Sequence, residues 1–330
     1  MSLPKGSSPK LNPLARIPRA MPVDERRMGT SPREGRTKRT HGLGPWGSRK
    51  DVSLARHTSF RIGGTAGVWY EPKDQEELAW FLKGMRRPAS FFVVGAGSNL
   101  LVKDGPIRKT FIHLDSPAFK KISVCGTRVE AGAGVLLSRL VSELKKKDLC
   151  GHEFLAGIPG TVGGAIVTNA GVRAREMKDL IEEVQVVDGR GRRFWIPKAR
   201  LKFSYRSSNL KPYIVVGCRL RLKRGDHRNV QANIRHILRD RFARQDRQYP
   251  SAGSFFKNPS PDLAAGWLID CCGLKGKRVG GAQVSVKHAN FIVNIGRAKS
   301  TDVLKLMEIV QRKVYNRFKI KLKPEVEIVG

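Results

Sequence analysis

The stretch Phe91-Phe92-Val93-Val94-Gly95-Ala96-Gly97-Ser98-Asn99-Leu100-Leu101-Val102 restricts the fold of this chain more than any other. An apolar strand runs into a glycine turn, whose small residues let backbone N–H groups approach an anion. Leu100-Leu101-Val102 is typical of a second strand, whereas a dinucleotide-binding Rossmann fingerprint would place a helix there. The stretch therefore indicates a phosphate cradle outside the Rossmann fold, with a plain tight turn as the alternative.

A second glycine cluster, Ile158-Pro159-Gly160-Thr161-Val162-Gly163-Gly164-Ala165, is followed by Asn169-Ala170-Gly171. Pro159 sets a turn, and the glycines permit close contact with a flat ligand or the start of a packed helix. The Asn169 amide is able to read the edge of a ring. Two such clusters suggest one long phosphorylated cofactor, and structural turns remain the alternative for each cluster taken separately.

The composition is that of a globular protein. A chain of 330 residues with 40% hydrophobic residues and 34 glycines suffices for about two or three α/β or α+β domains. No apolar run approaches the roughly 18 residues needed to span a bilayer. The cysteines lack metal-ligand spacing, so we expect reduced thiols, no metal site and a cytoplasmic protein; they are Cys125, Cys150, Cys218, Cys271 and Cys272.

The chain is strongly basic, with a formal net charge of +35. Residues 1–50 contain 12 Lys/Arg and 3 Asp/Glu, which leaves +26 on residues 51–330. Such a field attracts nucleic acid, anionic lipid or anionic small substrates, and a solvated face that aids solubility is an equal alternative. Residues 1–49 are rich in Pro, Gly, Ser and Arg without apolar periodicity, so we expect a disordered basic tail there.

The rest of the chain alternates short strands with single helices, which favours an α+β fold over a long parallel sheet. Order is expected from about Val52. Helical spacing predicts helices at about 74–82, 136–147, 229–244 and 301–318. Apolar runs predict strands at 91–94, 110–114, 128–131, 183–188, 193–197 and 213–222, with a terminal strand ending in Pro324-Glu325-Val326. The break at Arg224-Gly225-Asp226 is the expected start of a last domain.

Two later segments carry polar groups suited to chemistry. Tyr249–Pro259 holds Ser254 between a glycine and two phenylalanines, outside the Gly-x-Ser-x-Gly pattern of a hydrolase nucleophile. Lys257 and Asn258 offer donors to anionic oxygens, while core phenylalanines in a strand and turn are the alternative. In Phe203–Ser208, Arg206 beside a tyrosine and hydroxyls suits oxyanion recognition, with a solvated surface arginine as the alternative.

In this order the segments resemble the UDP-N-acetylenolpyruvoylglucosamine reductase (MurB) family, whose members are FAD-dependent enzymes of peptidoglycan synthesis. No single segment would decide the matter, but the ordered set is highly specific and covers the chain from about Leu54 to Gly330. The segments are HTSFRIGG (57–64), VVGAGSNLLVKDG (93–105), GAGV (132–135), LAGIPGTVGGAIVTNAG (155–171), FSYRSS (203–208), PSAGSFFKNP (250–259), AAGWLIDCCGLKGKRVGGAQVSVKHANFIVN (264–294) and KPEVEIVG (323–330).

The resemblance implies an α+β fold with a two-part FAD-binding region, of the type shared with vanillyl-alcohol oxidase, and a C-terminal α+β substrate-binding domain. On this basis we expect FAD-binding subdomains at 50–105 and 106–223, a substrate-binding domain at 224–318, and a C-terminal strand at 319–330 that returns to the active site. The flavin is expected between the two glycine clusters, at Gly95, Ala96, Gly97, Ser98, Asn99, Ile158, Pro159, Gly160, Thr161, Gly163, Gly164, Ala165 and Asn169.

The resemblance also implies the reaction. NADPH reduces FAD, and the reduced flavin passes hydride to UDP-N-acetylglucosamine enolpyruvate, which yields UDP-N-acetylmuramate. The family's catalytic positions fall on Arg206, Ser254 and Glu325. This agrees with the chemistry: Arg206 and Glu325 would stabilise an enolate-like anion, and Ser254 would protonate it on carbon. The two phenylalanines after Ser254 would keep the site dry.

Further family positions imply substrate contacts, with Lys257 and Asn258 near the diphosphate and Tyr205 beside them. The basic pair Arg244 and Arg247 falls at substrate-contacting positions, and His288 is a weaker candidate. The chain lacks a few residues of many members just before Tyr249, which leaves the reach of Arg247 open. The short link after Leu222 leaves no room for an extra substrate-capping loop and indicates the family's shorter subtype.

Two other functions stay open. One is a different FAD-dependent oxidoreductase on the same scaffold, acting on a small alcohol or sugar acid; the complete set of Arg206, Ser254 and Glu325 argues against it. The other is a basic protein associated with nucleic acid or membrane, although no recognised nucleic-acid module is present. We expect a monomer that acts on a UDP-sugar, binds no specific nucleic acid and associates at most weakly with anionic membrane surfaces.

Overall fold

The computed structural model describes residues 47–85, 91–172 and 175–330. Most of the expected tail at 1–49 lies outside these ranges, but its last residues belong to the fold. Ser48 is buried, and Arg49 forms two backbone hydrogen bonds with Trp69, of 2.8 and 2.7 Å. Arg49 also forms an ion pair with Glu71 at 2.7 Å. The folded part therefore begins before the expected position at Val52.

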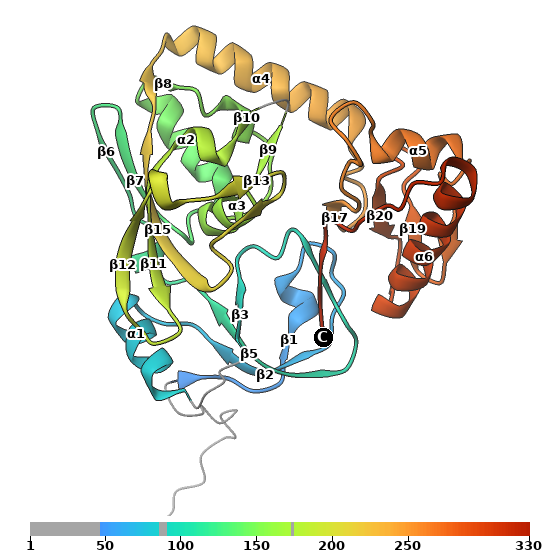
Figure 1. Cartoon of the computed structure of the whole chain (residues 1–330), viewed down its shortest axis with the longest axis horizontal. Coiled ribbons are helices and arrows are strands. Elements are labelled where there is room, and N and C mark those ends of the chain that lie inside the picture. The colour runs from blue at the N-terminus through green and yellow to red at the C-terminus, as the bar shows by residue number, and fades with distance from the viewer. Residues whose placement is uncertain (1–46, 86–90, 173–174) are drawn as a thin grey trace, which may run out of the picture. The chain divides into compact units, whose positions relative to one another are not determined.

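The first part of the fold is a four-stranded sheet in the order β1-β2-β5-β3 (Figure 1). Its strands are β1 (Val52–Ser53), β2 (Thr65–Tyr70), β3 (Phe91–Val94) and β5 (Pro106–His113). β5 lies between β2 and β3 and is parallel to both, so the expected subdomain boundary at residue 105 cuts through this sheet. α1 (Gln75–Gly84) starts at Asp74, whose carboxylate accepts a hydrogen bond from the Glu77 N–H at 2.8 Å.

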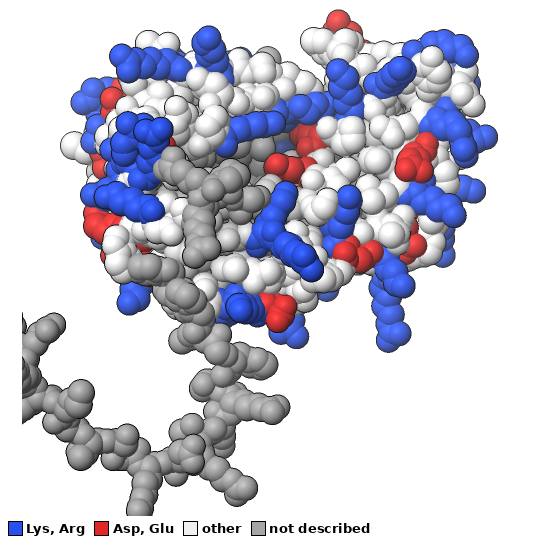
Figure 2. Space-filling view, turned by 60° about the horizontal axis from the view of Figure 1, so that its bottom comes forward, with Lys and Arg blue, Asp and Glu red and all other residues white. Residues whose placement is uncertain are grey.

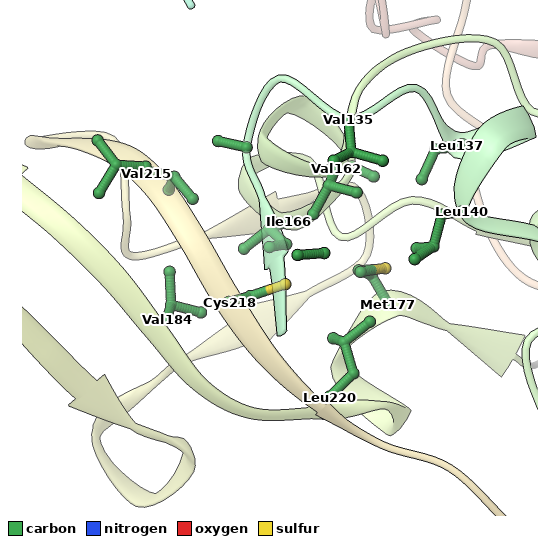
Figure 3. Packing of buried hydrophobic residues seen from close by; sticks show 14 of the residues in the cluster. Val135, Leu137, Leu140, Val162, Ile166, Met177, Val184, Val215, Cys218 and Leu220 are labelled. Atoms are coloured by element: carbon green, nitrogen blue, oxygen red, sulfur yellow. The ribbon is translucent and has the colours of Figure 1, made fainter. Parts of the chain in front are cut away.

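The second part is a five-stranded antiparallel sheet in the order β12-β11-β15-β7-β6. α2 (Leu137–Lys146) and α3 (Val162–Val167) contribute apolar side chains to the core on one of its faces. Figure 3 shows Cys218 of β15 directed toward Ile166 of α3, and both side chains are buried. The strands are β6 (Ile122–Cys125), β7 (Arg128–Gly132), β11 (Ile181–Asp188), β12 (Arg193–Pro197) and β15 (Tyr213–Arg221).

Short two-stranded ladders surround this sheet. They are β8 (Leu149–Cys150) with β16 (Lys223–Arg224), β9 (Gly171–Val172) with β10 (Arg175–Glu176), and β13 (Phe203–Ser204) with β14 (Ser207–Ser208). The β13–β14 hairpin turns at Tyr205 and Arg206, which places both side chains at the tip of a tight turn.

α4 (His227–Arg244) follows β16 and begins at the cap residue Asp226, whose carboxylate accepts a hydrogen bond from the Asn229 N–H at 2.9 Å. Its buried residues Val230 and Ile234 belong to the hydrophobic core of the five-stranded sheet. The expected start of the last domain at residue 224 is therefore too early, because α4 packs on the preceding core. The next core begins with Ala252.

The third part is a four-stranded sheet in the order β17-β20-β19-β18, with helices α5 (Ala265–Cys271) and α6 (Ser300–Phe318). Its strands are β17 (Ser251–Ser254), β18 (Arg278–Val279), β19 (Ala282–Val284) and β20 (Phe291–Asn294). Its core also contains Phe60, Ile62 and Leu101 from the first part of the chain. The C-terminal domain thus shares its core with residues close to the first sheet.

The final strand β21 (Glu327–Val329) pairs in parallel with β4 (Leu100–Val102), directly after the first glycine cluster. It lies a few residues later than the expected strand ending at Val326, because Pro324 forms only an isolated bridge with Phe256. The mixture of separate helices and mostly antiparallel sheets confirms the α+β class. In the described ranges, no helix is both long and apolar enough to cross a bilayer.

Candidate active site

A cavity of about 1850 Å³ is lined by residues of all three larger sheets. Its lining includes both glycine clusters and the three expected catalytic residues Arg206, Ser254 and Glu325. A volume of this size exceeds that of an ordinary small-molecule site of roughly 300–1,000 Å³. It therefore offers room for a long ligand beside a second one.

The two glycine clusters meet on one wall of this cavity. The Ser98 hydroxyl donates a hydrogen bond to the Pro159 carbonyl at 3.1 Å. A Cβ on Gly95 would lie 2.6 Å from Thr161 Oγ1, and one on Gly160 would lie 3.2 Å from Ser98 Oγ. Gly97 has φ +61°, and a Cβ there would overlap the backbone oxygen of His57. The small residues are therefore required for the clusters to touch and to expose their backbone to the cavity.

Asn169 does not lie on this wall. Its side chain is fully buried, and its amide donates to the Glu176 carboxylate at 2.9 Å and to the Ser204 carbonyl at 3.2 Å. Its side-chain oxygen accepts from the Lys178 N–H at 3.1 Å. All of this polar capacity is used inside the protein, so the expectation that Asn169 reads a ligand ring is wrong. The residue instead fixes the loop behind the second glycine cluster.

Another part of the cavity lining carries an ion pair between Arg206 and Glu325, with Nε and Oε1 2.6 Å apart. Both side chains are mostly buried, at 22% and 18% exposure. Arg206 also donates to the Gly171 carbonyl at 3.0 Å, and its backbone adopts the left-handed conformation with φ +54°. A non-glycine residue in this conformation is strained, and such strain concentrates at functional sites.

Glu325 is positioned by its backbone. Its N–H donates to the Phe255 carbonyl at 2.8 Å, next to Ser254, and its carbonyl accepts from the Asn99 side-chain amide at 3.1 Å. Asn99 thus connects the first glycine cluster to the C-terminal segment. Burial raises the pKa of Glu325 above its ordinary value, although the charges of Arg206 and Lys257 act in the opposite direction.

Ser254 ends β17 opposite Phe291, and its hydroxyl has no hydrogen-bond partner among the described residues. It follows Gly253, which has φ +77°, so the chain turns sharply just before it. Phe255 and Phe256 are 1% exposed and pack into the C-terminal core. Their rings do not line the cavity, so the expectation that they keep the site dry stays a prediction.

Three arginines of α4 and the segment after it line the cavity: Arg241, Arg244 and Arg247. Arg241 was missed by the sequence analysis, although its spacing of three residues from Arg244 continues the series. It donates to the Gly157 carbonyl at 3.3 Å, and its buried Nε has no partner among the described residues. Burial, together with the charge of Arg206, lowers the pKa of the Arg241 guanidinium. An arginine nevertheless stays charged at neutral pH, so Arg241 contributes positive charge to the cavity.

The other expected substrate contacts divide into two groups. His288 lines the cavity, with its ring 4.7 Å from that of Phe291 and its Nδ1 accepting from the Asn290 N–H at 3.2 Å. Tyr205, Lys257 and Asn258 lie outside the lining. The Tyr205 hydroxyl accepts from the Asn258 N–H at 3.4 Å, and the Asn258 side-chain oxygen accepts from the Ala265 N–H at 3.1 Å. Asn258 thus holds the start of α5.

Comparison with known proteins agrees with this geometry. The sequence model described as "UDP-N-acetylenolpyruvoylglucosamine reductase, C-terminal domain" matches residues 245–329, and that described as "FAD binding domain" matches residues 66–196. A UDP-N-acetylenolpyruvoylglucosamine reductase of Caldanaerobacter subterraneus is 42% identical over 280 residues, which cover 84% of this chain and 92% of that protein. The chain belongs to the UDP-N-acetylenolpyruvoylglucosamine reductase family. The resemblance found in the sequence is therefore confirmed.

Other members of the reductase family give the same result. The enzyme of that name from Rhodospirillum rubrum is 39% identical over 285 residues, covering 85% of this chain and 89% of that protein. A crystal structure of the reductase from Thermus caldophilus superposes with a TM-score of 0.76 at 38% identity, covering 86% of this chain and all of that one. The family's C-terminal match begins at Gln245, directly after α4, where the hydrophobic cores also divide.

Proposed function

We propose that this chain reduces UDP-N-acetylglucosamine enolpyruvate to UDP-N-acetylmuramate, with NADPH as reductant and FAD as bound cofactor, and that Arg206, Ser254 and Glu325 carry the chemistry. Membership of the reductase family supports the reaction. The observation that supports the residue roles is their convergence. A mostly buried Arg206–Glu325 pair and a Ser254 hydroxyl with no partner in the described part of the chain line one cavity with both glycine clusters.

The wall of glycines fits a flavin cofactor. Gly95–Asn99 and Ile158–Gly164 lie against each other with their backbone along the cavity, and a side chain on Gly95 or Gly160 would fill the contact. We assign FAD to this wall; when bound, it would supply the hydride chemistry that connects NADPH with the substrate double bond. The glycine clusters would hold the cofactor, and the charged side chains of the same cavity would be left for the substrate.

The arginines that line the cavity suit a diphosphate. Arg241 and Arg244 lie one turn apart on α4, Arg247 follows the helix, and the only acid on α4 is Asp240. Guanidinium groups bind phosphate oxygens through paired N–H donors. We assign Arg241 to the most buried of these contacts, because an anionic oxygen would satisfy its unpaired Nε. Lys257 and Asn258 are proposed only as outer contacts of the same substrate.

Arg206 and Glu325 would act on the charge that develops during hydride addition. The enolpyruvyl group becomes an enolate-like anion, and a fixed guanidinium in a poorly hydrated site stabilises such charge strongly. Glu325 holds the Arg206 side chain by its Nε, so that the remaining N–H groups keep one orientation. The strained backbone of Arg206 indicates that the hairpin is held in this position by its surroundings.

Ser254 would supply the proton to carbon. A serine hydroxyl is a weak acid, but an enolate is a strong base, so the transfer is favourable when the geometry is fixed. Two features support the assignment: the hydroxyl is not committed to another group of the described protein, and β17 fixes its backbone against Phe291. Glu325 lies close by, because its N–H binds the carbonyl of the residue after Ser254.

The proposal is tested in three steps on the purified protein. Flavin absorbance should be present or restored by added FAD, anaerobic NADPH should bleach it, and UDP-N-acetylglucosamine enolpyruvate should restore it. A protein that stays colourless with FAD would contradict the assignment of the glycine wall. Bleaching without reoxidation by this substrate would instead support an FAD-dependent oxidoreductase of another specificity.

A further inference from the structure

An aromatic and basic surface covers part of the C-terminal domain outside the cavity. It consists of Trp267 from α5, Tyr315, Arg317 and Phe318 from α6, and Lys319 and Lys321 just after that helix; we call it the α5–α6 surface. Trp267 is 56% exposed and Tyr315 is 41% exposed, so both rings present apolar surface to solvent. None of these six residues lines the catalytic cavity.

The rings and the cations of this surface are interleaved. The ring of Trp267 lies 5.9 Å from that of Phe318, and the Arg317 guanidinium is 5.4 Å from the Phe318 centroid. The ammonium groups of Lys319 and Lys321 each lie 5.8 Å from the Tyr315 centroid. Arg317 also donates to the Cys271 carbonyl at the end of α5, so α5 and α6 present the patch as one unit.

The local charge is strongly positive. From Lys305 to Lys323 the chain has seven Lys/Arg and one acid, Glu308. Lys and Arg side chains are spread over the whole face drawn in Figure 2, so positive charge alone does not distinguish one region from another. The α5–α6 surface combines two exposed rings, Trp267 and Tyr315, and the partly buried ring of Phe318 with that charge.

We propose that the α5–α6 surface binds the headgroup region of anionic phospholipid bilayers. Trp and Tyr rings favour the boundary between water and hydrocarbon, because they combine an apolar body with a polar tip. Lysine stems extend along such a boundary while their ammonium groups stay with the phosphates. A surface that combines both kinds of side chain gains apolar burial and electrostatic attraction together.

The same contacts argue against single-stranded nucleic acid as the occupant. Binding of bases requires free aromatic faces on which they stack, and a groove that follows the backbone. Here the Arg317 guanidinium and the two lysine ammonium groups already lie over the faces of Phe318 and Tyr315. None of the six residues lines a described cavity.

The test is sedimentation of the full chain with vesicles of phosphatidylcholine, with and without phosphatidylglycerol, at increasing salt. Binding should require phosphatidylglycerol and should weaken as salt screens the lysines. Each basic residue at an anionic surface contributes about a fivefold gain in partitioning, so Lys319→Gln with Lys321→Gln should reduce binding roughly 25-fold. Trp267→Ser should reduce it severalfold and abolish a blue shift of tryptophan emission on vesicles.

Matched controls separate this surface from the overall charge. Lys146→Gln with Lys147→Gln removes the same charge from exposed positions at the end of α2, and Trp80→Ser removes a ring that is 57% exposed on α1. Both controls should bind vesicles as the unchanged chain does, and reductase turnover should be equal in all variants. Equal losses in the control and test variants would overturn the proposal. So would the absence of vesicle binding, or a loss of oligo-dT binding on Trp267→Ser with vesicle binding unchanged.

Discussion

The two walls of the cavity are built by different means. The glycine wall consists of backbone and small side chains that touch each other, as in the Ser98–Pro159 hydrogen bond and the contact of Gly95 with Thr161. The charged wall is assembled from side chains of distant segments, including Arg206, Arg241 and Glu325. The first wall is defined by shape, because its small residues bring backbone rather than side chains to the cavity. The second wall holds charged side chains that are partly buried, and among them Arg241 Nε lacks a partner among the described residues.

This difference predicts how each wall responds to mutation. A change on the glycine wall should alter folding and cofactor retention, because its atoms are already in contact. A change on the charged wall should alter catalysis with little effect on the fold. Its side chains include polar atoms, such as Arg241 Nε, that have no partner among the described residues and are therefore available to a ligand.

Ser254→Ala should lower kcat for the enolpyruvyl substrate by roughly 1,000-fold, within the range for loss of a general acid. Flavin reduction by NADPH should stay nearly unchanged, since the hydroxyl acts only after hydride transfer. Stopped-flow absorbance of the flavin separates the two half-reactions. The control Ser260→Ala changes an exposed serine in the segment that follows. An equal loss in both half-reactions of Ser254→Ala would contradict the role of proton donor.

Gly97→Ala should destabilise the protein by about 3 kcal/mol, because the left-handed conformation and a clash with the His57 oxygen act together. Gly126→Ala is the matched control: its φ of +59° is similar, but a Cβ there meets nothing within 4 Å. That control should cost only about 1 kcal/mol. Thermal unfolding measures both, and only Gly97→Ala should also lose FAD. Similar costs at the two positions would contradict a wall defined by contact.

Glu325→Gln should reduce kcat roughly 100-fold, since the glutamine keeps the shape but loses the charge that orients Arg206. The pH profile gives a second result. The pKa of Glu325 is raised by burial, so the ionised form and the activity of the unchanged enzyme are lost as pH falls toward that pKa. Glu325→Gln should lack this acidic limb, whereas Glu308→Gln, at an exposed carboxylate of α6 outside the cavity lining, should retain it. If Glu325→Gln still loses activity as pH falls, a titratable residue other than Glu325 causes the acidic limb.

The smallest effect is expected at His152, which lies behind the glycine wall beside the cavity residue Glu153. Its ring is fully buried and neither nitrogen has a partner among the described residues. Burial lowers the pKa of His152 below 6.5, so the unfolded chain binds more protons there and stability falls as pH drops below 6.5. His152→Leu should flatten this part of the stability curve in denaturant titrations, whereas His236→Gln, at an exposed position, should not.

The sequence predicted the glycine wall well, because a glycine turn between two strands is a local pattern. It also predicted α1, α2, α4 and α6 to within a few residues, since these helices have regular apolar spacing or clear caps. The burial of individual side chains was harder to predict, because it depends on which distant segments of the chain pack over them. Asn169 was expected at the ligand and is fully enclosed, while Arg241 was overlooked although it continues the spacing of Arg244 and Arg247. The short helix α5 lacks a side-chain cap and was not predicted.

The charged wall shows the limit of motif reasoning most clearly. Ser254 and its two phenylalanines form one motif, yet the serine faces the cavity and the rings belong to the C-terminal core. α4 was expected with the last domain because a glycine break precedes it, but Val230 and Ile234 bury against the other core. Which core an amphipathic helix joins is decided by tertiary packing, and composition contains no sign of it.

The shared core of the C-terminal domain determines how the cavity is able to open. Phe60, Ile62 and Leu101 are packed among the C-terminal residues, and the Asn294 side chain donates to the Phe60 carbonyl at 3.2 Å. Ser59 donates to the Ser251 carbonyl at 2.7 Å, directly at the start of β17. If the C-terminal domain rotated away from the first sheet at this junction, the buried side chains of Phe60 and Ile62 would be exposed to water. We therefore expect ligands to enter by movement of side chains and loops around the cavity, and not by separation of the C-terminal domain from the first glycine cluster.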